Sequence, residues 1–98
     1  MAQYEYDLDE DLEIREPSKY KVLLLNDDYS TMDFVIEVLV KVFRKTIDEA
    51  SSIMLEVHHK GKAICGIYPK EIASTKVAQV STMARSEGFP LKAILEEE

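Results

Sequence analysis

The pattern of apolar and polar positions divides the chain into stretches that are typical of strands and helices. Residues 20–25 and 63–68 combine β-favouring and apolar side chains, so each is predicted to form a strand. Residues 32–44 are predicted to be helical, but their apolar positions cover roughly two thirds of the helical wheel, against about 100° in a surface helix. Such a helix is either covered on most sides, or it faces the core and also lines a surface pocket.

A turn is predicted between the first strand and this helix. Residues 26–31 are rich in Asn, Asp and Ser, which bond their own backbone in turns. Ser30 or Thr31 can cap the helix, and Asp33 in its first turn suits the positive end of the helix dipole.

Two further helices are predicted from their end signals. Thr46 and Glu49 have the spacing of a capping box, so a second helix is expected from Thr46 to about His59. Pro69 suits the first turn of a third helix, and Gly88 suits its C-terminal cap.

A short third strand is predicted over residues 91–95, after Pro90. The order of elements is therefore β-α-α-β-α-β. With so few strands, an antiparallel sheet that carries helices on one face is the natural packing. The predicted fold class is α+β, with a small three-stranded antiparallel sheet packed against three helices. A length of 98 residues suits one domain.

Charge is distributed unevenly along the chain. Residues 1–17 hold seven acidic residues against the single base Arg15, whereas residues 18–98 hold twelve acidic and eleven basic residues. We therefore predict a flexible acidic arm over residues 1–18, which ends at Pro17-Ser18, and a folded core domain over residues 19–98. The arm is either a solubilising tail or an active part of the protein.

Composition argues against several classes of partner and compartment. A net charge of −7 repels phosphate backbones, so nucleic acid is not expected as a partner. No apolar run approaches the roughly 18–20 residues that span a bilayer, so we expect no membrane partner. Cys65 is the single cysteine, which fits a reducing compartment, so the cytoplasm is the predicted location.

The candidate chemistry lies in two polar clusters, at Asn26-Asp27-Asp28 and at His58-His59. A metal site that uses Asp27, Asp28, His58 and His59 is disfavoured, because the adjacent histidines diverge by about 100° on a helix. An acid–base hydrolase that uses Asp27 and His58 lacks a nucleophile, since Cys65 lies in an apolar strand. On spacing alone, the favoured interpretation of the two clusters is structural: an ordinary turn after the strand, and a histidine at the C-terminus of a helix. We expect no catalytic residue, cofactor or metal.

Three blocks of sequence, in order, resemble one family. Residues 20–35, which read YKVLLLNDDYSTMDFV, resemble the opening of ClpS, the adaptor of the Clp ATP-dependent protease that reads N-end rule signals. Residues 54–66 and 71–77 resemble two later blocks of the same family, so the resemblance covers residues 19–95. It implies an adaptor that is not an enzyme. Its expected partners are N-degron peptides and the N-terminal domain of a Clp AAA+ unfoldase, and it is expected to be a monomer.

The resemblance also implies roles for individual residues. The α-amino group of a peptide that begins with Leu, Phe, Tyr or Trp is expected to be held by Asn26, Asp27 and His58. The pocket for the first side chain is expected to be lined by Ser30, Met32, Val35, Met54, Val57 and Leu91. Contact with the unfoldase is expected at Glu71 and Lys76. The acidic arm matches the mobile extension of the family.

Three residues depart from the family pattern, and one alternative function stays open. Ser30-Thr31-Met32 stands where the family commonly has Thr-Pro-Met, and His59 replaces a common aromatic residue. The alternative is an interaction module similar to those of the ribosomal stalk, which shares this order of elements. Such a module does not need Asn26, Asp27 and His58 to converge beside a pocket, so finding them far apart would favour it.

Overall fold

The structure is a computed structural model that describes residues 17–98. The predicted acidic arm, residues 1–18, therefore lies almost wholly outside the described residues. The elements are β1 (Lys19–Leu25), α2 (Met32–Lys41), α3 (Ile47–Lys60), β2 (Lys62–Pro69), α4 (Lys70–Glu87) and β3 (Lys92–Glu97). Their order, β-α-α-β-α-β, confirms the predicted α+β fold.

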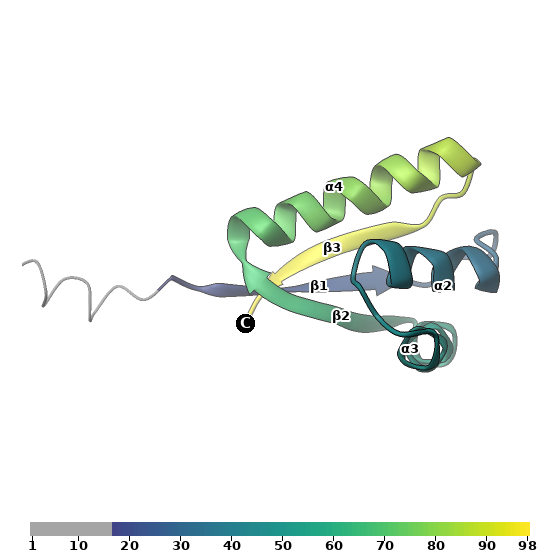
Figure 1. The fold of residues 1–98 in the computed structure, drawn as a ribbon, viewed down its shortest axis with the longest axis horizontal. Helices are drawn as coiled ribbons and strands as arrows, with labels where there is room; N and C mark the ends of the chain where they lie inside the picture. Colours follow the sequence, from purple (N-terminus) through teal and green to yellow (C-terminus); the bar gives the residue numbers. More distant parts are fainter. Residues whose placement is uncertain (1–16) are drawn as a thin grey trace, which may run out of the picture.

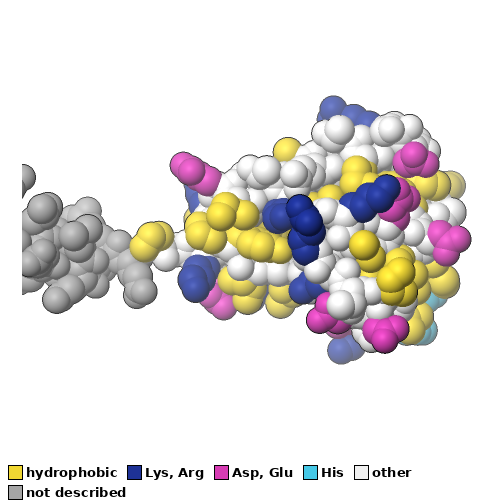
Figure 2. Space-filling view, in the orientation of Figure 1, with side chains coloured by type: hydrophobic (Ala, Val, Ile, Leu, Met, Phe, Trp, Pro, Cys, Tyr) yellow, Lys and Arg dark blue, Asp and Glu magenta, His cyan; other side chains and the backbone are white. Residues whose placement is uncertain are grey.

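The three strands form one antiparallel sheet in the order β2-β1-β3. The register between β1 and β2 shifts between Val22 and Leu23, which are paired with Gly66 and Ile64. In Figure 1, α4 runs along the sheet, whereas α2 and α3 gather at the end where β1 finishes. In Figure 2, the histidine side chains lie at this same end, away from the point where the described chain begins. The turn after β1 and the end of α3 are thus close to each other.

The hydrophobic core lies between the three helices and one face of the sheet. Alternate strand residues point into it, as the period of two in a strand requires. The core members that the strands contribute are Val22, Leu24, Ala63, Cys65 and Ala93. The Phe34 ring of α2 packs against the Phe89 ring at a centroid distance of 4.8 Å, which fixes α2 against the connection from α4 to β3. None of the helices within residues 17–98 is long and apolar enough to cross a membrane.

The helix caps agree with the sequence and resolve one choice that it left open. Thr31 caps α2, because its Oγ1 accepts a hydrogen bond of 3.1 Å from the Phe34 N–H. The predicted capping box of α3 is confirmed: Thr46 and Glu49 each accept a hydrogen bond from the other's backbone N–H. Gly88 ends α4 in the left-handed conformation, as predicted.

The predicted end of the first helix at Arg44 is wrong, because α2 ends at Lys41. Arg44 adopts a left-handed conformation with a φ of 57°, and the Lys45 N–H donates to the Leu39 carbonyl at 3.1 Å. Val42 and Phe43 keep their apolar side chains buried within this turn. Their burial therefore continues the apolar pattern beyond the end of the helix, which explains why the pattern overestimates its length.

Candidate functional site

The turn after β1 is built around the Asp27 carboxylate. Asp27 Oδ1 accepts hydrogen bonds from the backbone N–H groups of Tyr29 at 2.8 Å and Ser30 at 2.7 Å. Its Oδ2 accepts a third hydrogen bond, at 2.8 Å, from the Ser30 hydroxyl. This is the local bonding that Asp and Ser favour in turns. It fixes the direction in which the chain leaves the strand and enters α2.

These hydrogen bonds also set the charge of the turn. Partial burial acts to raise the pKa of Asp27, but the donors of Ser30 and Tyr29 together outweigh it, so the pKa lies below its ordinary value. Asp27 is therefore a carboxylate at neutral pH. Because each carboxylate oxygen has two lone pairs, three internal donors leave it able to accept a further hydrogen bond.

A backbone hydrogen bond holds the end of α3 beside this turn. The Asn26 N–H donates to the Gly61 carbonyl at 2.9 Å, and the Gly61 N–H donates to the Val57 carbonyl at 2.9 Å. Gly61 has a φ of 90°, a left-handed conformation that glycine adopts without steric cost. The last turn of α3, which carries His58, is thus brought to the edge where β1 ends.

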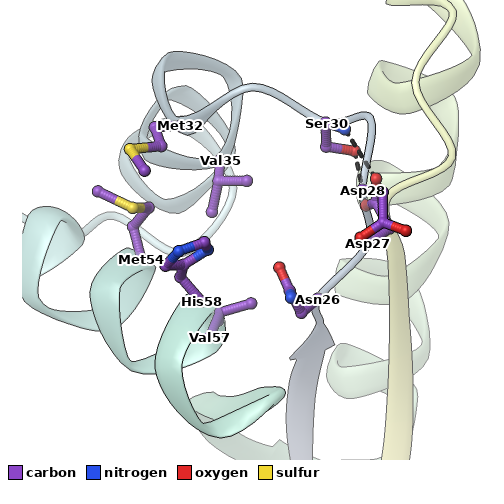
Figure 3. Close-up of a pocket in the computed structure, with 9 residues that line it drawn as sticks. All are labelled: Asn26, Asp27, Asp28, Ser30, Met32, Val35, Met54, Val57 and His58. Atoms are coloured by element: carbon purple, nitrogen blue, oxygen red, sulfur yellow. Dashed lines mark hydrogen bonds between the residues drawn. The ribbon is translucent and has the colours of Figure 1, made fainter.

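The two segments enclose a pocket of about 240 Å³ between α2, α3 and the turn. Figure 3 shows the side chains that line it: Asn26, Asp27, Asp28, Ser30, Met32, Val35, Met54, Val57 and His58. Its inner wall is apolar and includes the buried residues Val35, Met54 and Val57, whereas the polar side chains of Asn26 and His58 are exposed at its rim. The pocket is therefore apolar inside and rich in hydrogen-bond acceptors at its edge.

Eight of the nine residues predicted to contact the peptide line this one pocket. Leu91 is the exception: it is buried and lines a small adjoining cavity of about 20 Å³, which shares five lining residues with the pocket, namely Asn26, Asp27, Ser30, Val35 and Val57. Asp28 also lines the pocket, although the sequence suggested it only as a metal ligand. Its position in an unbroken run of acceptors, directly after Asp27, is the signal that could have identified it.

Neither of the two residues predicted to contact the unfoldase lines the pocket. Glu71 is exposed in the first turn of α4, beside a surface hollow near Pro17 and Tyr20. Lys76 is partly buried, and its Nζ donates to the Val42 carbonyl at 2.8 Å. This bond satisfies a carbonyl at the C-terminal end of α2, so Lys76 also has a role inside the domain.

The geometry bears on the other chemistries considered from the sequence. Within residues 17–98, no three His, Cys, Asp or Glu side chains lie close enough together to hold a metal ion. Burial raises the pKa of the Cys65 thiol to about 12, so the thiol stays protonated at neutral pH and is a poor nucleophile. Asn26, Asp27 and His58 meet in one pocket, whereas a stalk-like module gives no reason for this convergence.

Comparison with known proteins identifies the family. Residues 15–94 match the family described as "ATP-dependent Clp protease adaptor protein ClpS". The chain belongs to the ClpS family. The protein is therefore an adaptor of the ATP-dependent Clp protease.

Individual ClpS proteins are similar over most of the chain. The "ATP-dependent Clp protease adapter protein ClpS" of Wolinella succinogenes is 54% identical over 96 residues, which cover 98% of this chain and 94% of the relative. The ClpS of Shewanella piezotolerans is 60% identical over 85 residues, 87% of this chain and 83% of that relative.

A solved structure of the ClpS family shows the same fold. It is that of Agrobacterium tumefaciens ClpS2 bound to L-phenylalaninamide, and it matches with a TM-score of 0.83 and 38% sequence identity. The match covers 85% of this chain and 100% of the other.

Proposed function

We propose that this protein binds the free α-amino group and the bulky apolar first side chain of a polypeptide, and delivers that polypeptide to a Clp unfoldase for degradation. The proposal depends on one observation above all. A pocket with an apolar inner wall carries Asn26, Asp27 and His58 together at its polar edge. On this account the protein binds and delivers its substrates and does not transform them chemically.

The polar edge suits an α-ammonium group. A free α-amino group has a pKa of about 7.7–8.0, so it is mostly charged at neutral pH and offers three N–H donors. The matching acceptors are the amide oxygen of Asn26, the carboxylate of Asp27 and an unprotonated ring nitrogen of His58. An internal residue or an acetylated N-terminus lacks this charge, so the edge selects true chain ends.

The apolar part suits a single side chain. Pockets for drug-sized ligands have volumes of about 300–1,000 Å³, and this one, at about 240 Å³, has room for one large residue and little more. We propose that it accepts Leu, Phe, Tyr and Trp. The bound compound in the A. tumefaciens ClpS2 structure supports this assignment, because L-phenylalaninamide has a free α-amino group and an aromatic side chain.

The expected affinity is moderate. Charge-assisted hydrogen bonds contribute roughly 1.5–3 kcal/mol each, and burial of a Leu or Phe side chain contributes about 1.5–3 kcal/mol. Association costs roughly 4–15 kcal/mol. With three such bonds and the side-chain burial at their upper values, and the association cost at its lowest, the balance is about 8 kcal/mol, which corresponds to micromolar binding. Binding is therefore expected to be no tighter than micromolar, which suits a protein that must release its substrate to a protease.

Delivery requires a second surface, and we propose that the N-terminal domain of the Clp unfoldase contacts α4 at Glu71 and Lys76. Glu71 is exposed and free to reach a partner. Lys76 also bonds to Val42 within the domain, so a Glu71 variant tests this surface more cleanly. Glu71→Lys should weaken binding to the unfoldase and leave peptide binding unchanged. The cytoplasm and a monomeric state remain predictions from the sequence.

The experiment that tests the pocket is a titration with peptides that differ only in their first residue. Leu-, Phe-, Tyr- and Trp-initiated peptides should bind well, whereas Ala- and Asp-initiated peptides should bind poorly, because they bury little apolar surface. The proposal fails if the Ala-initiated peptide binds within about threefold of the Leu-initiated one, a difference below 1 kcal/mol.

A further inference from the structure

The sheet has a second face, which points away from the helices. Leu23 in the middle of β1 is paired with Ile64 of β2 and with Ile94 of β3, so the three side chains form one row across this face. Ile67 of β2 lies in the next row, opposite Lys21. None of these residues lines the pocket. We call the surface formed by Leu23, Ile64, Ile67 and Ile94 the open face.

The open face leaves apolar surface in contact with solvent. Ile64 and Ile67 have 45% and 44% of their surface exposed. Leu23 is buried, and an ion pair between Lys62 and Glu96 lies diagonally across its row. This pair is long, at 3.9 Å, and the side chains of Lys62 and Glu96 are 57% and 42% exposed, so it contributes little to stability. Exposed apolar surface with a polar rim is typical of an interaction site.

The rim of the open face is basic. Lys19 and Lys21 of β1, Lys62 of β2 and Lys92 of β3 are on the same side of the sheet as Leu23, by strand alternation. The acidic residues on this side are Glu96 and, beside Lys19, Glu98. The rest of residues 17–98 carries more acidic than basic side chains. The open face therefore differs in charge from the rest of the domain, and it suits an acidic occupant.

The N-terminal arm has the complementary sequence. From Tyr4 to Asp9 it reads Tyr-Glu-Tyr-Asp-Leu-Asp, so apolar and acidic side chains alternate with the period of a strand. Residues 1–16 hold seven acidic residues against Arg15. The chain enters β1 at Lys19, which belongs to the rim. At about 3.3 Å per residue, residues 10–16 are long enough to connect this point to a segment that lies back along β1.

We infer that the arm folds back onto the open face of its own domain. Tyr4, Tyr6 and Leu8 cover the exposed isoleucines, while the acidic side chains between them pair with the lysines of the rim. A second copy of the domain is a poorer occupant, because its rim would bring lysines against lysines. The inference does not depend on the proposed function, because the open face and the pocket share no residue.

The arm can be located by paramagnetic relaxation in the full chain. Ala2→Cys provides a site for a nitroxide label, while Cys65 is buried and stays unlabelled. If the arm is docked, the amide signals of Ile64 and Ile94 lose far more intensity than those of Ala78 and Thr82 on α4. A free arm gives similar losses on both faces. The difference should disappear at about 1 M salt, where charges are screened within roughly 3 Å.

Matched variants separate docking from other causes. Lys62→Glu with Lys92→Glu should abolish the selective loss, whereas Lys41→Glu with Lys45→Glu, the same charge change on the helical side, should preserve it. Tyr4→Ser with Tyr6→Ser tests the apolar contact without a change of charge. This double variant should also abolish the selective signal loss. Equal losses on both faces in the parent protein overturn the inference. So does a selective loss that grows with protein concentration, because it indicates contact between two copies.

Discussion

The inner wall and the outer rim of the pocket differ in how strongly the fold depends on them. Val35, Met54 and Val57 form the wall, and each has less than a tenth of its surface exposed because it also belongs to the core. Met32 at the mouth is 51% exposed, and Asn26 and His58 are exposed at the polar edge. The shape of the pocket is therefore a consequence of folding, whereas the rim residues contribute little to the core.

This difference has a practical consequence for mutagenesis. A change in the wall alters stability and binding together, so weakened binding alone does not reveal a contact with the ligand. A change at the rim should alter binding or selectivity and leave the fold intact. Four substitutions test this division, in order of decreasing expected effect.

Met54→Ala should have the largest effect, and it should act on stability. Met54 is buried in the core cluster, and removal of a buried Met side chain typically costs about 2–5 kcal/mol. Urea denaturation should show this decrease in the free energy of unfolding, and the binding of a Leu-initiated peptide should weaken with it. A variant that unfolds at the urea concentration of the parent would contradict the assignment of Met54 to the core.

His58→Ala should act on binding and leave stability unchanged. Loss of one charge-assisted hydrogen bond corresponds to roughly 1.5–3 kcal/mol, or about a ten- to hundredfold increase in the Kd of a Leu-initiated peptide. His59→Ala is the matched control, because His59 is an exposed neighbour that does not line the pocket. If both variants weaken binding equally, or if His58→Ala has no effect, His58 is not an acceptor for the α-amino group.

Met32→Ala should change selectivity. We propose that Met32 lies beside the β-carbon of the bound residue, where the extra methyl group of Ile or Val would overpack the site by about 1–3 kcal/mol. The variant should bind Ile- and Val-initiated peptides more tightly and Leu-initiated peptides slightly less tightly. Because half of the surface of Met32 is exposed, the melting temperature of the variant should be close to that of the parent protein.

The control for Met32 is Leu55→Ala, which removes a partly exposed side chain of α3 outside the pocket. Peptide titrations and thermal melts on both variants separate the two explanations. An unchanged preference for Leu over Ile in Met32→Ala, combined with a large drop in melting temperature, would mean that Met32 serves the core alone.

Asp27→Asn should weaken peptide binding, because it removes a charged acceptor from the polar edge. Its effect on stability should be smaller than that of Met54→Ala and should depend on pH. The pKa of Asp27 is lowered in the folded protein, so its charged form stabilises the turn. This stabilisation is present above the ordinary pKa of 3.8 and is lost as the pH falls through the lower folded value. At pH 7 the variant should be less stable than the parent by about 1 kcal/mol.

The measurement is the difference in melting temperature between parent and variant at neutral and at acidic pH. The difference should shrink as the pH falls below 3.8 and through the lowered pKa of Asp27, because the parent then loses the same charge. Asp28→Asn, at the exposed neighbouring position, should show a smaller difference at neutral pH. A difference for Asp27→Asn that is the same at both pH values would show that charge does not stabilise this turn.

Most of the fold was predictable because its signals are local. The capping box at Thr46 and Glu49 and the left-handed glycine at Gly88 each act within a few residues. The end of α2 was not predictable in this way, because Val42 and Phe43 stay buried after the helix has ended. Burial in the tertiary structure continues the apolar pattern, so the pattern alone cannot mark the end of the helix.

The site was predictable in part, and the reasons are again physical. Spacing alone favoured an ordinary turn and a helix-end histidine, because a sequence does not show that Asn26 and Gly61 share a backbone hydrogen bond. The resemblance to ClpS predicted that Asn26, Asp27 and His58 act together, which their spacing in the sequence did not indicate. The bond from Lys76 to the Val42 carbonyl joins residues 34 positions apart, and no local signal points to it.

The most direct test of the account compares a Leu-initiated peptide with the same peptide acetylated at its N-terminus. Acetylation removes the positive charge and leaves the Leu side chain in place, so it isolates the polar edge of the pocket from the apolar wall. Calorimetric titration should give micromolar binding for the free peptide and at least about a tenfold weaker Kd for the acetylated one. Binding of both peptides within about threefold of each other would contradict recognition of the α-amino group.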